Sequence, residues 1–193
     1  MLPRKQEAHG RIGEAAVAAK CWMHGVRAYN TNGLRANFAG SDLIIDTADP
    51  RRKLLIQVKT GYPLSPGKVY LTQATGDADL LVDKFRADFV VFVNIDKKVG
   101  ESHRYEGLLG FEHLHFYVVP AEDANRLFRA QVRDDYEKPK RDGSRRSLTN
   151  MAVQVDVEKF QVFRDAWHRV RNAVDLGRGA ISDDVAEFPQ GQS

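Results

Sequence analysis

The sequence predicts an α/β fold for this chain of 193 residues, and three observations support that class. An Ala-rich segment from Glu7 to His24, ended by Gly25, is typical of a helix. Two short runs with β-branched residues, Gly40–Asp46 and Leu54–Thr60, are typical of half-buried strands. The continuous apolar run Phe89–Asn94 is typical of a strand that is covered on both faces.

Length and composition suit one domain. The hydrophobic share of 42% and the charged share of 28% are ordinary for a globular protein, and the chain is long enough to close one substantial core. We expect a single domain over residues 1–176, with its core at about 7–128, a basic loop at 137–147 and a C-terminal helix at 157–175. The Gly-, Asp- and Gln-rich segment 177–193 is expected to be a disordered tail.

Several classes of protein are disfavoured by the sequence. No apolar run approaches a membrane span and the first residues lack the apolar centre of a signal peptide, so we expect a cytoplasmic location and no membrane partner. The only cysteine, Cys21, excludes an intrachain disulfide and a Cys-based zinc cluster. We expect no organic cofactor. A net charge of +3 and a pI near 9.0 are compatible with nucleic acid, but carry weight only where the charges cluster.

The two strand-like runs are predicted to form a hairpin. The link between them contains the step Asp49–Pro50, which is typical of a turn. With the turn centred there, Asp42 lies opposite Gln57. Because side chains alternate across a strand, Asp42, Gln57 and Lys59 are predicted to share one face.

These three polar residues have two interpretations. A polar strand face is most often simply wet, but the neighbouring residues on this face are apolar. The alternative is a site for a hard divalent cation, which prefers carboxylate, amide and backbone oxygens. Asp42, the Gln57 amide and the Val58 carbonyl would supply these oxygens. Lys59 would orient or help deprotonate a water and offset the charge of a phosphate.

At these residues the chain resembles the PD-(D/E)XK nuclease superfamily, whose pattern is an acid on an early helix, an Asp on one strand and acid-x-Lys on the next. Here Glu14, Asp42, Gln57 and Lys59 would fill the pattern. Gln57 stands where most members carry Glu or Asp, although some active relatives, including a transposase endonuclease subunit, carry Gln. The resemblance implies a restriction-endonuclease-like core (αβββαβ), a mixed central sheet flanked by helices, and an extra C-terminal helix.

The resemblance also implies a function, which is a metal-dependent DNA endonuclease that hydrolyses phosphodiester bonds with Mg²⁺ or Mn²⁺. Asp42, Gln57, Val58 and Glu14 would hold the ion, and Lys59 would hold the attacking water. Related nucleases often act as dimers because two strands must be cut, so a homodimer is expected. Two other hypotheses stay open: a catalytically inactive nuclease-fold module that binds nucleic acid or a protein partner, and a subunit whose partner completes the site.

Glu14 lies in the predicted helix among small apolar neighbours, where a carboxylate needs a hydrogen bond, a charged partner or a metal. It could instead be a surface residue paired with Arg11 or Lys20. Small residues such as Gly13 would let this helix sit close to a sheet. The buried stripe of the helix is predicted from three- and four-residue steps to be Ile12, Ala16, Ala19 and Met23.

Side chains near the site and one basic segment could contact DNA. The segment 138–146 holds five cationic residues in nine. Such a run is usually a solvated loop, but beside a nuclease core it would be an arm that binds phosphates without sequence choice. Taken singly, the other polar residues could belong to ordinary loops. The predicted contacts to nucleic acid are Arg35, Asn37, Ser41, Lys68, Lys138, Lys140, Arg141, Arg145 and Arg146.

The remaining elements are predicted from shorter patterns. We expect a short strand at 68–72, helices at 77–86 and 124–133, and a strand at 114–119. Tyr62, Lys68 and Tyr70 could line a groove beside the site that suits unstacked bases or phosphates, although a tyrosine in a strand is more often part of the core. Asp96 is interpreted as a turn former. The histidines show no spacing that indicates a metal site or a catalytic triad, so we expect them to be structural or solvated.

Overall fold

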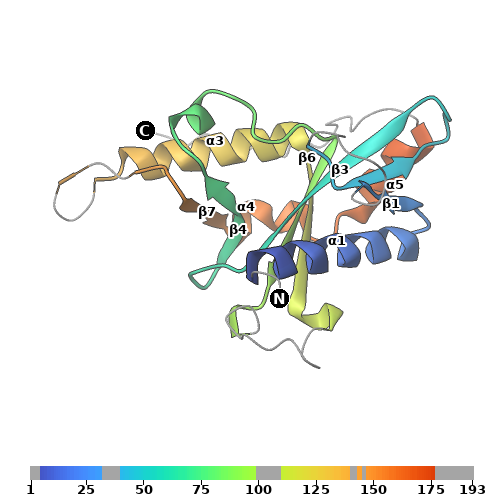
Figure 1. Ribbon diagram of the computed structural model, residues 1–193, viewed down its shortest axis with the longest axis horizontal. Coiled ribbons are helices and arrows are strands. Elements are labelled where there is room, and N and C mark those ends of the chain that lie inside the picture. Colours follow the sequence, from blue (N-terminus) through green and yellow to red (C-terminus); the bar gives the residue numbers. More distant parts are fainter. Residues whose placement is uncertain (1–4, 32–39, 99–109, 140–142, 145–146, 177–193) are drawn as a thin grey trace.

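A mixed sheet flanked by helices forms the centre of the computed structural model (Figure 1), so the predicted α/β fold class is confirmed. No helix in the described ranges is long and apolar enough to cross a membrane. The structure describes residues 5–31, 40–98, 110–139, 143–144 and 147–176. The elements in chain order are α1 (Lys5–Met23), β1 (Ala28–Asn30), β2 (Leu43–Asp46), β3 (Lys53–Gly61), β4 (Lys68–Ala74), the 3₁₀ turn η2 (Asp77–Leu80), β5 (Phe89–Ile95), the 3₁₀ turn η3 (Phe111–His113), β6 (Leu114–Pro120), α3 (Ala121–Glu137), β7 (Met151–Asp156), α4 (Val157–Phe160), the 3₁₀ turn η4 (Gln161–Phe163) and α5 (Trp167–Leu176).

The central sheet has five strands in the order β1-β2-β3-β5-β6, and only the pair β3 and β5 is parallel. Strands β2 and β3 form the predicted hairpin. Ile44 lies opposite Leu55, which is the predicted register. The N–H of Asp42 donates at 2.8 Å to the carbonyl of Ile56, the residue that already pairs with Leu43, so the regular register ends at Leu43.

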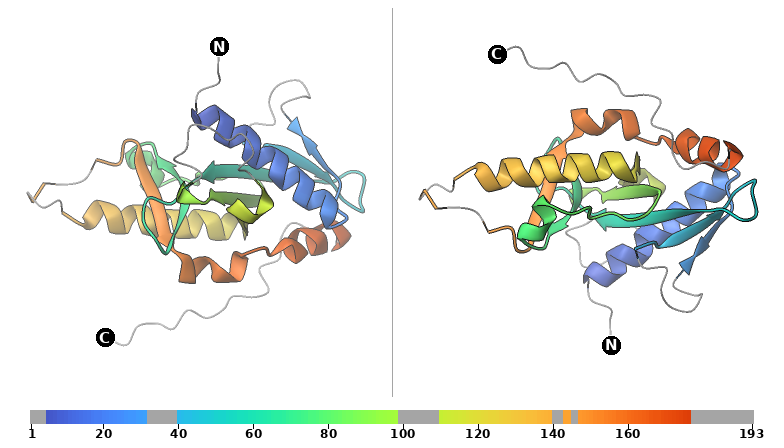
Figure 2. Two further views of the ribbon diagram at one scale, coloured as in Figure 1. Left: turned by 90° about the horizontal axis from the view of Figure 1, so that it is seen from below. Right: turned by 90° about the horizontal axis from the view of Figure 1, so that it is seen from above.

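Apolar layers cover both faces of this sheet. One core joins α1 and α5 to the sheet, and the other joins α3 and the two-stranded sheet β4-β7. Figure 2 shows α1 and α3 on opposite sides of the strands. Every residue of β5 is buried, as expected for an apolar strand between two layers.

Helix α1 lies close to β3, as the small residues in its sequence predict. A Cβ atom at Gly13 would overlap the hydroxyl of Thr60, so only glycine allows this approach. The predicted buried stripe is wrong at its end, because Met23 is 70% exposed, whereas Val17 and Cys21 are fully buried. The Ala-rich helix is apolar on several sides, so periodicity alone did not define its buried face.

The predicted helix at 77–86 is a single 3₁₀ turn, Asp77–Leu80, followed by an irregular segment. Side-chain caps replace the helical hydrogen bonds in this segment. The Asn125 amide bonds both the N–H and the carbonyl of Phe85, at 2.9 Å each. Leu81, which a helix would have buried, is 81% exposed. A segment whose backbone is held by distant side chains does not need to complete a helix.

The C-terminal helix is also interrupted, since α4, η4 and α5 replace one helix at 157–175. The break lies at Asp165, which has a left-handed φ of 48° and donates its N–H to the carbonyl of Phe116 at 2.9 Å. The strand Met151–Asp156 was not predicted, although its alternating sequence is typical of a strand. It pairs with β4 beside the main sheet.

Candidate functional site

The site begins at Asp42, whose backbone and side chain are both fixed by hydrogen bonds. Its carbonyl accepts the N–H of Thr31 at 3.0 Å, in addition to the bond that its own N–H donates to β3. Its carboxylate oxygen Oδ2 accepts the N–H of Val58 at 2.7 Å. The carboxylate therefore lies against β3 at the point where the pairing of β2 with β3 ends.

Gln57 and Lys59 lie on one face of β3, and the Asp42 carboxylate meets the edge of this strand at the backbone of Val58, between them. The paired residues of β2 and β3 end at Leu43 and Ile56, so the predicted pairing of Asp42 with Gln57 lies beyond the end of the ladder. All three side chains are half-buried. Asp42 thus lies against the backbone between Gln57 and Lys59, close enough for its charge to act on the Lys59 ammonium.

The amide oxygen Oε1 of Gln57 is buried and has no hydrogen-bond partner in the described part of the chain. A buried carbonyl oxygen without a partner costs free energy, and the large majority of such groups in proteins are satisfied. This oxygen is therefore in a position to accept a ligand that the chain itself does not supply.

The carbonyl of Val58 adds a further oxygen at the same edge. In a strand the N–H and the carbonyl of one residue point to the same side. The N–H of Val58 is taken by the Asp42 carboxylate, and β2 pairs with β3 only as far as Leu43 and Ile56. The Val58 carbonyl thus points beyond the end of β2, toward the side on which Asp42 lies.

Glu14 reaches this edge from the other face of the sheet. Helix α1 packs in the core that includes Val58, whereas Gln57 and Lys59 point away from that core. The Glu14 carboxylate accepts a hydrogen bond from the Asn30 amide at 3.1 Å. Asn30 in β1 pairs with Leu43, the residue after Asp42. Arg11, one of the two cations predicted as alternative partners of Glu14, pairs with Glu7 at 2.8 Å.

The charges around Lys59 act on its pKa in opposite directions. Burial lowers the pKa of Lys59 below the 10.5 of an ordinary lysine. The nearby negative charges of Asp42 and Glu14 oppose this change, and the positive charge of Lys84 adds to it. Both carboxylates are thus close enough to stabilise the ammonium, but the net effect is a pKa of Lys59 below 10.5.

Lys84 was not among the predicted site residues. Its ammonium lies 3.1 Å from both carboxylate oxygens of Asp79, and 5.4 Å from the centre of the Phe128 ring. Asp79 also accepts the N–H of Thr75. No local pattern could have indicated Lys84, because the irregular segment after η2 determines its position.

The predicted contacts to DNA are placed in different surroundings. Ser41 is buried, Lys68 forms an ion pair with Asp156 at 2.6 Å, and Lys138 is exposed just after α3. The other predicted contacts lie outside the described residues and stay predictions: Arg35, Asn37, Lys140, Arg141, Arg145 and Arg146.

Two histidines meet Asp96 at the other end of the sheet. His115 Nε2 lies 2.8 Å from Asp96 Oδ1, and His113 Nδ1 lies 3.1 Å from Asp96 Oδ2. Spacing along the chain did not predict this cluster, because it forms across β5 and β6. Among the described residues, no group of three or more His, Cys, Asp or Glu side chains is arranged to hold a metal ion. A metal in the Asp42 site would therefore need amide and backbone oxygens as well.

Fold and site together define an α/β protein with a polar site at the edge of a mixed sheet. No family model matches the chain, and no curated protein matches it. Among solved structures it is similar to a bacterial homing endonuclease, I-Ssp6803I, with 16% sequence identity and a TM-score of 0.47. The likeness covers 87% of this chain and 92% of that one. Membership of the PD-(D/E)XK superfamily stays a prediction from the residues of the site.

Proposed function

We propose that the chain is a metal-dependent endonuclease that hydrolyses phosphodiester bonds in DNA. One observation carries this proposal: the Asp42 carboxylate bonds the backbone of Val58, between Gln57 and Lys59, and the buried Gln57 oxygen has no partner among the described residues. A carboxylate, an unsatisfied amide oxygen and a lysine with a lowered pKa suit phosphate hydrolysis better than they suit a structural role.

The oxygens at this edge fit Mg²⁺ or Mn²⁺. Asp42 would contribute the carboxylate oxygen Oδ1, which Val58 does not use, and Gln57 would contribute Oε1. The Val58 carbonyl and Glu14 would complete the protein ligands. Hard cations of this kind accept a mixture of carboxylate, carbonyl and water oxygens. A bound cation would stabilise the negative charge that develops on the phosphodiester during attack by water.

Lys59 acts on the attacking water. Because burial lowers its pKa, a larger fraction of its side chain is neutral near physiological pH than for an ordinary lysine, and a neutral amine can accept a proton. Once protonated, the ammonium offsets charge on the phosphate. The positive charge of Lys84 adds to the effect of burial on the pKa of Lys59, since a second positive charge disfavours the protonated form.

Asp42→Asn is the test of this function, because asparagine keeps an oxygen that can accept the Val58 N–H but removes the charge. The matched control is Asp88→Asn. Asp88 Oδ2 accepts the N–H of Leu55 at 2.7 Å, the same length as the bond from Val58 to Asp42, but lies outside the site.

We expect Asp42→Asn to lose nicking of supercoiled plasmid by about a thousandfold in Mg²⁺ or Mn²⁺, with Asp88→Asn close to wild type. Equal residual cleavage by wild type and Asp42→Asn would assign the activity to another site or to a contaminant, and would contradict the proposal.

A second function, a nuclease fold that binds nucleic acid or a protein without cutting, is favoured by one observation. Gln57 removes a charge from the site, and no group of three acidic or metal-binding side chains is present in the described ranges. Calorimetric titration with Mn²⁺ separates the two functions. Binding that Asp42→Asn abolishes supports the endonuclease, whereas intact DNA affinity without Mn²⁺ binding supports the inactive module.

A further inference from the structure

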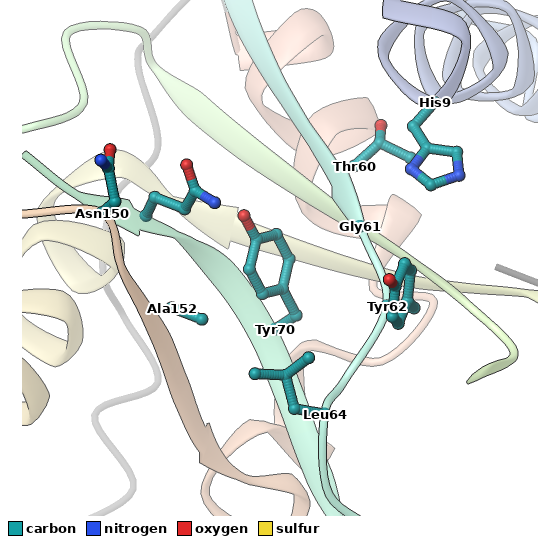
Figure 3. Close-up of a pocket in the computed structure, with 9 residues that line it drawn as sticks. His9, Thr60, Gly61, Tyr62, Leu64, Tyr70, Asn150 and Ala152 are labelled. Atoms are coloured by element: carbon teal, nitrogen blue, oxygen red, sulfur yellow. The ribbon is translucent and has the colours of Figure 1, made fainter. Parts of the chain in front are cut away.

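A cavity of about 720 Å³ begins one residue beyond Lys59. Its walls come from the start of α1, the end of β3 with the loop that follows, and the sheet β4-β7 (Figure 3). Its lining residues are His9, Thr60, Gly61, Tyr62, Leu64, Tyr70, Gln73, Asn150 and Ala152. The volume is in the range of pockets that bury small organic ligands.

Aromatic side chains form two walls of the cavity. His9 and Tyr62 meet edge to face, with ring centres 6.0 Å apart. The Tyr70 ring packs on Gly61, where any Cβ atom would overlap it. The amide of Asn94 fixes the backbone of Tyr70, bonding its N–H at 2.7 Å and its carbonyl at 2.9 Å. Tyr70 therefore lies in a fixed position on the same face of β3 as Lys59.

The polar groups in the lining suit a neutral, planar ligand. Among the described residues, the lining contains no Lys, Arg, Asp or Glu that would provide a countercharge for a phosphate. The exposed amides of Gln73 and Asn150 offer both donors and acceptors. Aromatic faces combined with amide groups are the means by which proteins hold unstacked bases.

We propose that this cavity receives an unpaired nucleobase of the DNA strand whose phosphate lies at Lys59. The proposal rests on the proposed function, because it places the scissile phosphate at that lysine. Gly61, which forms the floor under Tyr70, lies two residues beyond Lys59, or about 7 Å along the strand. The nucleotide next to the phosphate can therefore reach the cavity once it leaves the stack. The substrate class is DNA with an extrahelical or single-stranded nucleotide beside the cut.

Binding without cleavage tests this proposal. The full chain is titrated in EDTA against three duplexes that differ only at one position: a bulged 2-aminopurine, a bulged abasic residue, and no bulge. We expect the 2-aminopurine bulge to bind about tenfold more tightly than the abasic bulge, the effect of one stacked base. Its fluorescence should fall as the base stacks on tyrosine.

Two variants and one control locate the effect. Tyr62→Leu removes an aromatic wall, and Asn150→Gly removes an amide while tolerating the left-handed φ of 59° at that position. Both should lose the preference for the base. The control Trp22→Leu alters a 54% exposed aromatic of α1, about 20 Å from His9 by helix rise, and should keep it. Circular dichroism establishes that each variant is folded.

The outcomes separate this inference from the proposed function. Equal affinity for the base and abasic bulges overturns the base pocket, even where Asp42-dependent cleavage is found. A base preference that both cavity variants lose, without any cleavage, supports the pocket and overturns the nuclease. A preference that Tyr62→Leu and Asn150→Gly retain places the base elsewhere and overturns the pocket. No affinity for any of the three duplexes overturns both.

Discussion

Lys59 and Lys84 are close enough for their charges to interact, yet the chain treats them differently. Lys84 is 16% exposed and pairs with Asp79, which is 6% exposed, at 3.1 Å. Lys59 lies in a half-buried site where burial lowers its pKa, despite the charges of Asp42 and Glu14. Lys84 thus has a charged partner within the fold, whereas burial lowers the pKa of Lys59.

The oxygen atoms near the two lysines differ in the same way: those near Lys84 have hydrogen-bond donors, and one near Lys59 has none among the described residues. Asp79 accepts bonds from Thr75 and Lys84, and the net effect is a lowered pKa for Asp79 even though burial alone would raise it. In contrast, Gln57 Oε1 is buried with no partner in the described part of the chain. A structural polar cluster completes its own hydrogen bonds, whereas a binding site leaves some of them for a ligand. Substitutions at the two lysines should therefore have opposite consequences for stability and activity.

Lys59→Met should have the largest effect, and only on activity. Removing the proton acceptor should slow single-turnover cleavage of plasmid DNA by about a thousandfold. The free energy of unfolding in urea should stay level or rise by about 1 kcal/mol, because a charge disfavoured by burial is removed.

The control for this change is Lys53→Met, on the same strand. Lys53 pairs with Asp46 at the surface, so its loss should cost no more than about 0.5 kcal/mol and leave cleavage intact. In the wild type, the cleavage rate should rise with pH through a pKa below 10.5. Wild-type cleavage rates in Lys59→Met would remove the lysine from the mechanism.

Lys84→Met should have the next largest effect, and mainly on stability. It leaves the carboxylate of Asp79 buried without its charged partner, which costs about 3 kcal/mol. Urea unfolding measures this loss, and the double variant Lys84→Met/Asp79→Leu should recover much of it. Because a positive charge near Lys59 is lost, the pH profile of cleavage should shift to higher pH. A loss below about 1 kcal/mol would mean that the buried pair contributes little.

The contrast between the lysines also explains how far the sequence could predict this site. Strand alternation was enough to predict that Gln57 and Lys59 share a face, and the hairpin brings Asp42 to the same part of β3. Lys84 could not be placed, because its position depends on caps from Asn125 and Asp79 rather than on a regular helix. Glu14 could be proposed only from the resemblance, since no pattern within one helix sets its distance to a sheet.

The fold divides in a similar way. The strand β5 could be predicted from its sequence, because burial on both faces requires a continuous apolar run. The buried face of α1 did not, because small residues on several sides of a helix weaken its periodicity. The break at Asp165 depends on a hydrogen bond to Phe116 in β6, a contact that only the tertiary structure creates.

The substitution Gln57→Glu tests whether residue 57 is a metal ligand. A carboxylate in place of the unsatisfied amide should bind Mn²⁺ about tenfold more tightly, because added ligand charge raises affinity for hard cations. Without metal, a further negative charge beside Asp42 should cost about 1 kcal/mol. Calorimetric titration and urea unfolding measure the two effects, with Gln161→Glu as an exposed control. Unchanged Mn²⁺ affinity would exclude residue 57 from the metal ligands.

The Asp96 cluster should give the smallest effect and provides a second satisfied polar group for the comparison. Partial burial raises the pKa of Asp96, but the hydrogen bonds from His115 and His113 outweigh it, so the net pKa is lowered below 3.8. A folded-state pKa below the unfolded value adds stability above about pH 4 that is lost as the pH falls through the lowered pKa. Asp96→Asn should therefore cost about 0.5 kcal/mol at neutral pH, in keeping with its partly exposed position.

The Asp96→Asn variant should also unfold with a weaker dependence on acid than the wild type, when urea midpoints are compared between pH 2 and 7. Cleavage should be unaffected, because the cluster completes its own hydrogen bonds and the site at Asp42 does not. An equal dependence on acid in both proteins would show that the histidines do not stabilise the Asp96 carboxylate.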